Sequence, residues 1–153
     1  MSEIVYCKLK TEDEAKKGYA LTAMKENNYW LGGGVTPPIL MNSAKKGEVI
    51  LAKDEDCVVG LLHYHCRRDG FCVIYHVCVH PNYRCKDIAR SMILLAPPPY
   101  QSIVRLNNIP IQKLYEKLGM ILVGEKKYLT KKKNQVHVLI YRSKDEEGLF
   151  DNC

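Results

Sequence analysis

The sequence lacks the features that mark several classes of protein. It contains no run of 18 apolar residues, which a membrane-spanning helix requires. Its N-terminus carries polar and charged side chains where a secretory signal peptide would need an apolar stretch. It has no internal repeat and no low-complexity linker. We therefore expect one domain, spanning residues 1–153, that works in the cytoplasm without a membrane contact.

Paired metal-ligand motifs are also missing, although the chain has seven cysteines. No two of them have the C-x-x-C spacing of a zinc or redox site, and their number is odd. Histidines and cysteines gather between residues 57 and 85, but on alternating strand positions rather than at the short spacing of metal ligands. We predict no metal site, and reduced thiols that mostly behave as small buried hydrophobic groups.

What is present fits an ordinary globular protein of 153 residues. Hydrophobic residues make up 46% and charged residues 26%, which excludes disorder, collagen-like repeats and coiled coils. Lysine and arginine number 23 against 17 acidic residues, and the net charge of +6 favours an anionic partner. A phosphate-bearing cofactor would satisfy this preference, and nucleic acid is a second possibility.

Strands and helices follow one another along the chain. Thr11 and Glu14 have capping-box spacing and start a helix. The residues at helical spacing that we expect to face the core are Ala15, Tyr19, Ala23 and Met24. Further helices are predicted at residues 88–96, ended by prolines, and at residues 110–118. Strands are predicted at residues 3–9, 48–53, 57–66, 71–80, 102–106, 120–130 and 135–142.

The element order predicts a mixed α/β (α+β) sheet, mostly antiparallel and flanked by helices. Its middle is an antiparallel meander, and the strand at 71–80 has so little polar alternation that we expect both its faces to be covered. Residues 27–43 predict a long connection with a short helical piece, and its glycines 32–34 suit a flexible substrate loop because no G-K-[ST] follows them. The core spans about residues 3–142, and the tail 143–153 is expected to be frayed.

The stretch from Val79 to Ala89 lies between a buried strand and a helix. Backbone N–H groups at a helix N-terminus lack intrahelical partners, and the positive end of the helix dipole lies behind them. Arg84 and Lys86 add positive charge there, and Arg90 follows one turn into the helix. This arrangement predicts a phosphate site, and the alternative is a solvated turn that carries basic residues.

Two motifs resemble the signature of one family, the GCN5-related N-acetyltransferases. The pattern V-x-P-x-Y-R-x-x-G-x-G/A is matched at Val79, Pro81, Tyr83, Arg84 and Ala89. The second pattern, N-x-x-A-x-x-x-Y-x-x-x-G-F, is matched in spacing by Asn108, Tyr115, Gly119 and Met120. The two together are much more specific than either alone. The resemblance covers about residues 3–142 and implies that family's acyl-CoA N-acyltransferase fold.

The resemblance implies that acetyl-CoA is the acetyl donor and that particular residues bind it. Backbone groups near Val77 and Val79 would pair with its pantetheine arm, as an added strand would. Asn108 would hydrogen-bond the cofactor, and Tyr115 would protonate the leaving thiolate. The amides that would hold the pyrophosphate belong to Arg84, Cys85, Lys86, Asp87, Ile88 and Ala89.

Two positions depart from the family pattern. Asp87 stands where the family has its first glycine, so a bulky negative side chain lies where a phosphate should approach. Its carboxylate either caps the following helix, turned aside from the phosphate, or marks a loop that has lost cofactor affinity. Ile111 replaces the usual alanine, a change of size that packing can absorb.

The strand at 71–80 has no glutamate, which often serves as the general base in this family. It offers Tyr75 and His76 instead, and His63 and His65 lie on the neighbouring strand. His76 is our first choice, because an imidazole can take a proton from an amine directly or through a water. The alternative is a hydrogen-bonded core histidine. Cys78 lacks an evident activating partner and is a weaker candidate for an acyl-carrying nucleophile.

The resemblance therefore implies an acetyl-CoA-dependent N-acetyltransferase. An amine of a small molecule or a protein would attack the thioester directly in a ternary complex. The alternative is a binding or nucleic-acid-modifying protein on the same fold, with altered or lost use of CoA and a basic hairpin that touches phosphates. In either case we expect a monomer or a homodimer.

Overall fold

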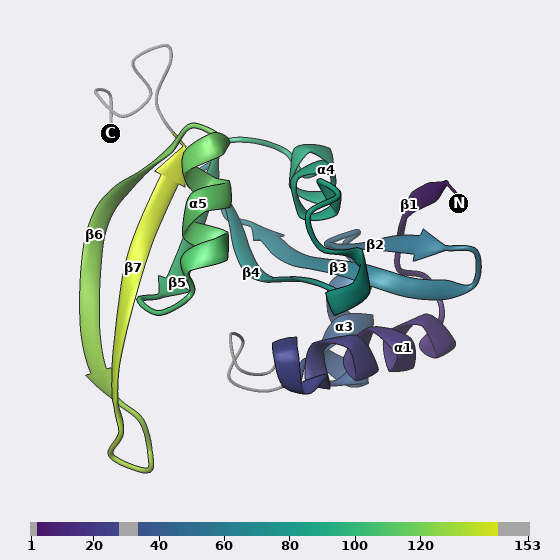
Figure 1. Ribbon diagram of the computed structural model, residues 1–153, viewed down its shortest axis with the longest axis horizontal. Coiled ribbons are helices and arrows are strands. Elements are labelled where there is room, and N and C mark those ends of the chain that lie inside the picture. Colours follow the sequence, from purple (N-terminus) through teal and green to yellow (C-terminus); the bar gives the residue numbers. More distant parts are fainter. Residues whose placement is uncertain (1–2, 28–33, 144–153) are drawn as a thin grey trace.

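The computed structural model describes residues 3–27 and 34–143. Over these residues the chain forms a seven-stranded sheet in the order β1-β2-β3-β4-β5-β7-β6 (Figure 1). The strands are β1 (Ile4–Lys8), β2 (Val49–Asp54), β3 (Cys57–Cys66), β4 (Cys72–Val79), β5 (Tyr100–Arg105), β6 (Met120–Leu129) and β7 (Gln135–Ser143). The neighbours β4 and β5 are parallel, whereas the other neighbouring pairs are antiparallel. This mixed, mostly antiparallel sheet confirms the predicted fold class.

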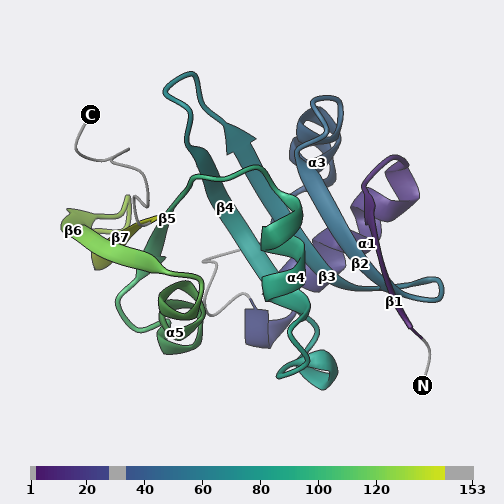
Figure 2. The same ribbon diagram turned by 90° about the horizontal axis from the view of Figure 1, so that it is seen from above.

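Helices cover both faces of the sheet (Figure 1 and Figure 2). α1 (Glu12–Ala23) and α3 (Pro37–Ala44) lie on one face, and α4 (Ile88–Leu95) and α5 (Ile109–Lys117) lie on the other. α3 is the short helical piece predicted within the connection 27–43, and it runs one residue beyond that range. Glycines 32 and 33 of that connection lie outside the described residues, as do residues 144–153 of the predicted tail. The prediction that the tail begins to fray at Ser143 is wrong, because Ser143 is the last residue of β7 and pairs with Met120 of β6. No helix within residues 3–27 and 34–143 combines the length and the apolar character that crossing a membrane demands.

The start of α1 is set by the predicted capping box. Thr11 Oγ1 accepts a hydrogen bond from the Glu14 amide at 3.1 Å, and Glu14 Oε1 accepts one from the Thr11 amide at 3.0 Å. The other carboxylate oxygen of Glu14 forms an ion pair with Lys53 of β2. The first turn of the helix is therefore tied to the sheet.

The buried face of α1 differs from the prediction. Tyr19 was expected in the core but is 41% exposed. The buried residues of the helix are Ala15, Gly18, Leu21 and Thr22. At Gly18 a Cβ atom would come within 2.8 Å of Leu61 Cδ1 on β3. α1 thus approaches β3 most closely at Gly18, and Tyr19, the next residue along the helix, is turned toward solvent.

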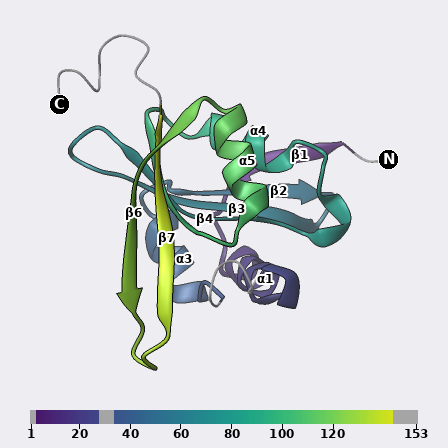
Figure 3. The same ribbon diagram turned by 60° about the vertical axis from the view of Figure 1, so that its left-hand side comes forward.

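β4 is central in the sheet, as predicted, but it is not covered along its whole length. Its two ends are buried, whereas Tyr75 is 50% exposed. The cause is a β-bulge: Ile74 and His76 pair with adjacent residues of β3, which leaves Tyr75 outside the register. The parallel pairing with β5 also ends at Ile74, opposite Ser102. β4 and β5 separate beyond this point, and Figure 3 shows β6 and β7 running across the direction of β2 and β3.

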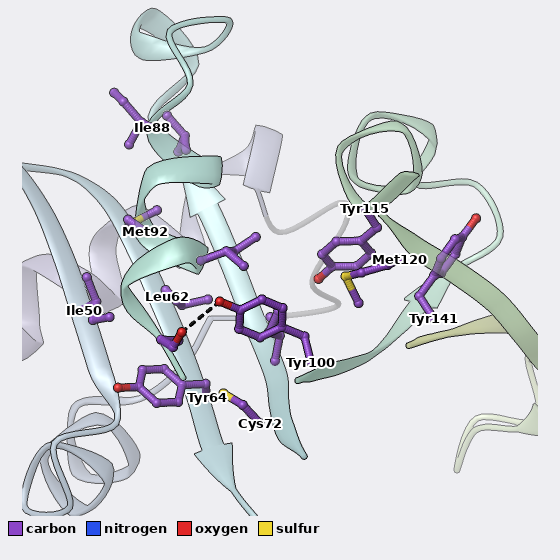
Figure 4. Close-up of a cluster of buried hydrophobic side chains, with 14 of the residues drawn as sticks. Ile50, Leu62, Tyr64, Cys72, Ile88, Met92, Tyr100, Tyr115, Met120 and Tyr141 are labelled. Carbon is purple, nitrogen blue, oxygen red and sulfur yellow. Dashed lines mark hydrogen bonds between the residues drawn. The ribbon is translucent and has the colours of Figure 1, made fainter. Parts of the chain in front are cut away.

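One buried cluster extends from α4 to α5. Figure 4 shows Met92 of α4 on the same side as Ile50 and Leu62 of the sheet, and Tyr115 of α5 near Met120 and Tyr141. Tyr100 lies between the two groups, and its hydroxyl donates a hydrogen bond to the Ala96 carbonyl at 2.8 Å. Because these side chains belong to the same cluster, the two helices are anchored in one core.

Candidate active site

A buried hydrogen-bonded chain lies where β4 and β5 separate. Ser102 Oγ donates a hydrogen bond to the Ile74 carbonyl at 3.1 Å, and the Tyr115 hydroxyl donates one to Ser102 Oγ at 2.8 Å. Tyr115 is 1% exposed. Burial raises the pKa of Tyr115 well above its ordinary value, and the bond to Ser102 offsets only part of that rise. The hydroxyl therefore keeps its proton at neutral pH. It lies next to the point where β4 and β5 separate, at Ile74 and Ser102, which we call the fork of the sheet.

A first cavity, of about 470 Å³, lies between β4 and α4 on one side and α5 on the other. The predicted cofactor residues that line it are Val77, Val79, Arg84, Cys85, Asp87, Ile88, Ala89 and Asn108. Lys86 is the exception, because it does not line the cavity and its Nζ atom lies 5.5 Å from the centre of the Tyr83 ring. The two sequence motifs thus converge on one cavity.

Positive charge surrounds the first cavity. The cationic residues that line it are Arg84, Arg90, Lys113 and Lys117, and Asp87 is the one acidic residue among the described lining residues. Lys113 and Lys117 stand at positions that the second motif leaves unspecified, although their spacing of four places both on one face of a helix. Arg84 also donates a part-buried hydrogen bond, at 2.9 Å, to Oδ1 of the buried Asn27, which lies four residues beyond the end of α1. No local pattern in the sequence indicates this contact.

Asp87 occupies the N-cap position of α4 in the left-handed conformation, with a φ of 58°. Its side chain makes no hydrogen bond to the helix, so the predicted alternative of a capping carboxylate is wrong. The reason lies in the backbone, because a capping side chain normally reaches the helix amides from an extended residue. Glycine adopts the left-handed conformation without strain, which accounts for the glycine of the family pattern at this position.

Asn108 begins α5 and lies between two cavities. Its Oδ1 accepts a hydrogen bond from the Ile111 amide at 3.4 Å and caps the helix. It lines the first cavity and also a second one, of about 180 Å³. Val77 and Ile111 likewise line both. The two cavities therefore adjoin, next to the fork of the sheet.

The second cavity carries a different set of side chains. Arg105 is its one cation among the described residues, and the other lining side chains are apolar or uncharged polar groups, among them Tyr75, His76, Ser102, Asn108, Tyr115 and Tyr128. None of the described lining residues is an aspartate or a glutamate. The predicted acid and the predicted base, Tyr115 and His76, thus meet at this cavity.

His76 is hydrogen-bonded to a second histidine. Its Nδ1 atom lies 3.1 Å from His63 Nδ1, and the two rings are parallel with their centres 5.3 Å apart. His63 Nε2 lies 2.8 Å from Ser43 Oγ on α3. Burial lowers the pKa of both rings, that of His63 to about 4, so both are neutral at pH 7. The sequence supports two interpretations of His76, as a general base or as a hydrogen-bonded core histidine. It has features of both, because it is hydrogen-bonded to the buried His63 and also lines the second cavity.

The remaining candidates are less suited to chemistry. His65 pairs with Glu48 at 3.0 Å and lines neither cavity. Cys78 lines the first cavity, but burial raises the pKa of its thiol to about 12. The positive charge of Arg84 lowers this pKa, but by less than burial raises it. Its sulfur is protonated at neutral pH and is a poor nucleophile. Among residues 3–27 and 34–143, no group of three or more His, Cys, Asp or Glu side chains is placed to hold a metal ion.

The match to a family model covers the first motif and all of the second except its last position, Met120. Residues 45–119 match the model described as Acetyltransferase (GNAT) domain. The matched segment runs from the end of α3 to the glycine after α5, and so it contains the β4–α4 junction and the N-terminus of α5. The sequence has no match among curated proteins.

Solved structures share the architecture. A GNAT-family acetyltransferase from Bacillus cereus has a TM-score of 0.72 at 16% identity, covering 94% of this chain and 99% of that chain. The ribosomal-protein-S18-alanine N-acetyltransferase of Escherichia coli has a TM-score of 0.70 at 14% identity, covering 95% and 97%. PaiA N-acetyltransferase from Thermoplasma acidophilum, in complex with coenzyme A, has a TM-score of 0.71 at 14% identity, covering 94% and 99%. At these identities the likeness establishes the fold over nearly the whole chain.

Proposed function

Because this chain carries a domain of the GNAT acetyltransferase family, we propose that it is an N-acetyltransferase that transfers an acetyl group from acetyl-CoA to an amine. The observation that carries this proposal is the pair of adjoining cavities where β4 and β5 separate. The first has the basic lining that phosphate groups need, and the second leaves room for an acceptor beside Tyr115.

The first cavity fits the chemistry of CoA. Its cationic side chains and the N-terminus of α4 supply positive potential for the phosphates. Beyond Ile74 β4 is no longer paired with β5. This open edge supports our assignment of the peptide groups near Val77 and Val79 to an extended pantetheine arm. We assign the amides of residues 84–89 to the pyrophosphate and Asn108 to a hydrogen bond with the cofactor. The likeness to a neighbour solved with coenzyme A supports CoA as the ligand of this fold.

The chemistry needs a proton donor and two reactants held together. Acetyl-CoA supplies the acetyl group as a thioester. The contact between the two cavities supports direct attack by an amine within a ternary complex, because positioning alone lowers the barrier substantially. Tyr115 holds a proton at its hydroxyl oxygen for the leaving sulfur, since the group is buried and protonated.

His76 is the proposed general base, as a neutral imidazole at the second cavity. The acceptor is an amine of a small molecule or a protein, and the name of the Escherichia coli neighbour gives a protein alanine as that enzyme's substrate. A cytoplasmic location and a monomeric or homodimeric state stay predictions from the sequence.

Cofactor binding tests the proposal. CoA and acetyl-CoA should bind and raise the melting temperature, because a ligand of the native state stabilises it by mass action. The double variant Lys113→Ser, Lys117→Ser should weaken CoA binding about tenfold, or ~1.4 kcal/mol, by calorimetry at fixed ionic strength. The matched control is Lys126→Ser, Lys127→Ser, which removes the same charge from β6 outside both cavities and should leave the affinity unchanged.

The same variants test the alternative of a nucleic-acid-binding protein. In that case the β6 variant would lose affinity for a short RNA or DNA duplex, and CoA would not bind at all. Millimolar CoA without a shift in melting temperature or a calorimetric signal would contradict the acetyltransferase proposal.

A further inference from the structure

Three side chains from three elements form a hydrogen-bonded chain beside the second cavity. Ser43 comes from α3, His63 from β3 and His76 from β4, and the contacts are 2.8 Å and 3.1 Å. His63 is 6% exposed, and a polar ring at that depth costs free energy unless its nitrogens are hydrogen-bonded. Both nitrogens of His63 have partners in this chain. The position of the proton on each ring therefore depends on its neighbour.

Two proton arrangements satisfy these contacts. Both rings are neutral at pH 7, so each carries one proton, and the bond between the two Nδ1 atoms needs a proton on one of them only. If His63 donates from Nδ1, His76 carries its proton on Nε2 and that atom can only donate. If His76 donates from Nδ1, His63 carries its proton on Nε2 and donates it to Ser43 Oγ. In this second arrangement His76 Nε2 has a bare lone pair.

We infer that Ser43 and His63 are positioning residues that hold His76 in the second arrangement, with Nε2 ready to accept the proton of the acceptor amine. This inference rests on the proposed function, because the amine of the acetyl transfer is the proton source. As the amine nitrogen bonds to the acetyl carbon, one N–H bond breaks and its electron pair stays on nitrogen. The proton binds the Nε2 lone pair, and the cationic His76 ring keeps its Nδ1 hydrogen bond to His63. The carbon–sulfur bond of the thioester then breaks with its electron pair on sulfur, which takes the proton held by Tyr115.

The surroundings set the direction of the pH dependence. Burial has the largest effect and lowers the pKa of His63; His76 and His65 lower it further, and Glu48, which alone favours the protonated ring, is outweighed. The Tyr75 ring lies 5.4 Å from the His63 ring, and Arg105 and Tyr128 line the cavity that His76 lines. Burial lowers the pKa of His76. The rate of acetyl transfer should therefore fall only at a pH below the usual range of histidine.

The first test reads the proton positions directly. Long-range proton–nitrogen spectra of the full chain, with labelled histidine at pH 7, distinguish protonated from bare ring nitrogens. We expect His76 to be protonated at Nδ1 and bare at Nε2, and His63 to be protonated at Nε2. In Ser43→Ala the preference should weaken, and in Ser43→Thr the retained hydroxyl should restore it. A His76 ring protonated at Nε2 in the wild-type protein would overturn the inference, whether or not the protein binds CoA.

The second test separates positioning from a purely structural role. With acetyl-CoA and a short peptide bearing a free α-amine as the probe, His63→Gln should lower kcat about tenfold and move the acidic limb of its pH profile. KM for acetyl-CoA should not change, because His63 lines neither cavity. The control His65→Gln, on the same strand, should leave kcat and the profile as they are.

An unmoved acidic limb in a folded His63→Gln protein would overturn the inference. Should His63→Gln fail to fold, kcat and its pH profile can be compared between Ser43→Ala and the wild-type protein instead, because Ser43 of α3 is the hydrogen-bond partner of His63. Failure of the wild-type protein to bind CoA would instead count against the proposed function. The spectra would still show which ring nitrogens of His63 and His76 carry protons.

Discussion

Asp87 combines an unfavourable backbone conformation with a negative charge beside the proposed phosphate site. The left-handed conformation costs an ordinary L-residue roughly 1–2 kcal/mol, less for aspartate, and glycine almost nothing. The carboxylate is also the one acidic group among the described residues that line a cavity with four cations. Two separate effects are therefore concentrated at one residue, and different substitutions separate them.

Replacing Asp87 with glycine should tighten CoA binding severalfold and leave stability equal or higher, because both the charge and the strain disappear. Asp87→Ala should tighten binding to a similar degree, since it also removes the charge. It should be about 1 kcal/mol less stable than the glycine variant, because alanine keeps a Cβ atom at positive φ. Calorimetry with CoA and urea unfolding measure the two effects. Weaker CoA binding in both folded variants would show that the carboxylate is a working part of the site.

Tyr115→Phe should lower kcat about 10- to 100-fold with little change in CoA affinity, because its hydroxyl acts on charge that develops only as the thioester breaks. It should also lose about 1 kcal/mol of stability with the bond to Ser102. Tyr100→Phe is the matched control, because it too removes a buried tyrosine hydrogen bond but lines neither cavity. Equal kcat values for the two variants, with chemistry rate-limiting, would exclude Tyr115 as the acid.

At the scale of the element, the N-terminus of α1 should depend on pH through Glu14. Burial alone would raise the pKa of this carboxyl, but the hydrogen bond from Lys53 and those from two backbone amides lower it from 4.5 to about 2. A folded-state pKa below the unfolded value contributes stability above pH 4.5, and that contribution is lost as the pH falls through about 2. Glu14→Gln should therefore cost about 1–3 kcal/mol at pH 7, and the difference from wild type should shrink toward pH 2.

Urea unfolding of the two proteins between pH 7 and pH 2 measures this effect. The control is Glu12→Gln, which removes an exposed carboxylate from the same turn and should change stability by only about 0.5 kcal/mol. A destabilisation by Glu14→Gln that stays constant down to pH 2 would contradict the expected role of the ion pair with Lys53.

At the scale of the whole molecule, CoA should link two parts of the chain that the fork of the sheet separates. The first cavity takes its lining from α4 and the turn before it and from α5. With CoA at 100 times its dissociation constant, openings that break the site become about 2.7 kcal/mol less favourable. Amide hydrogen exchange should therefore slow by up to about 100-fold in residues 84–95 and 109–117 together.

The loop between β6 and β7 is the internal reference for this measurement. Residues 130–134 are mostly exposed and lie outside both cavities, so their exchange should not respond to CoA. Protection confined to α4, with α5 unchanged, would mean that the ligand does not bridge the two parts.

The local patterns of the sequence determined the order of the elements and the two motifs of the site. The capping box of Thr11, the start of α5 near Pro110 and the hairpin before Gln135 all depend on residues within a few positions of one another. The strand–turn–helix at residues 79–89 is equally local. Short-range caps, turns and periodicities are set by neighbours along the chain, which is why these features could be predicted. The roles of Tyr115 and His76 stay predictions.

Only the tertiary structure decided which side chains meet. The bulge at Tyr75 depends on the register between β3 and β4, and the exposure of Tyr19 depends on how closely α1 approaches β3. The contact between His63 and His76, and the entry of Lys113 into the first cavity, likewise join segments distant in sequence. Such contacts result from packing of whole layers against one another, and the spacing of residues along the chain carries no information about that packing.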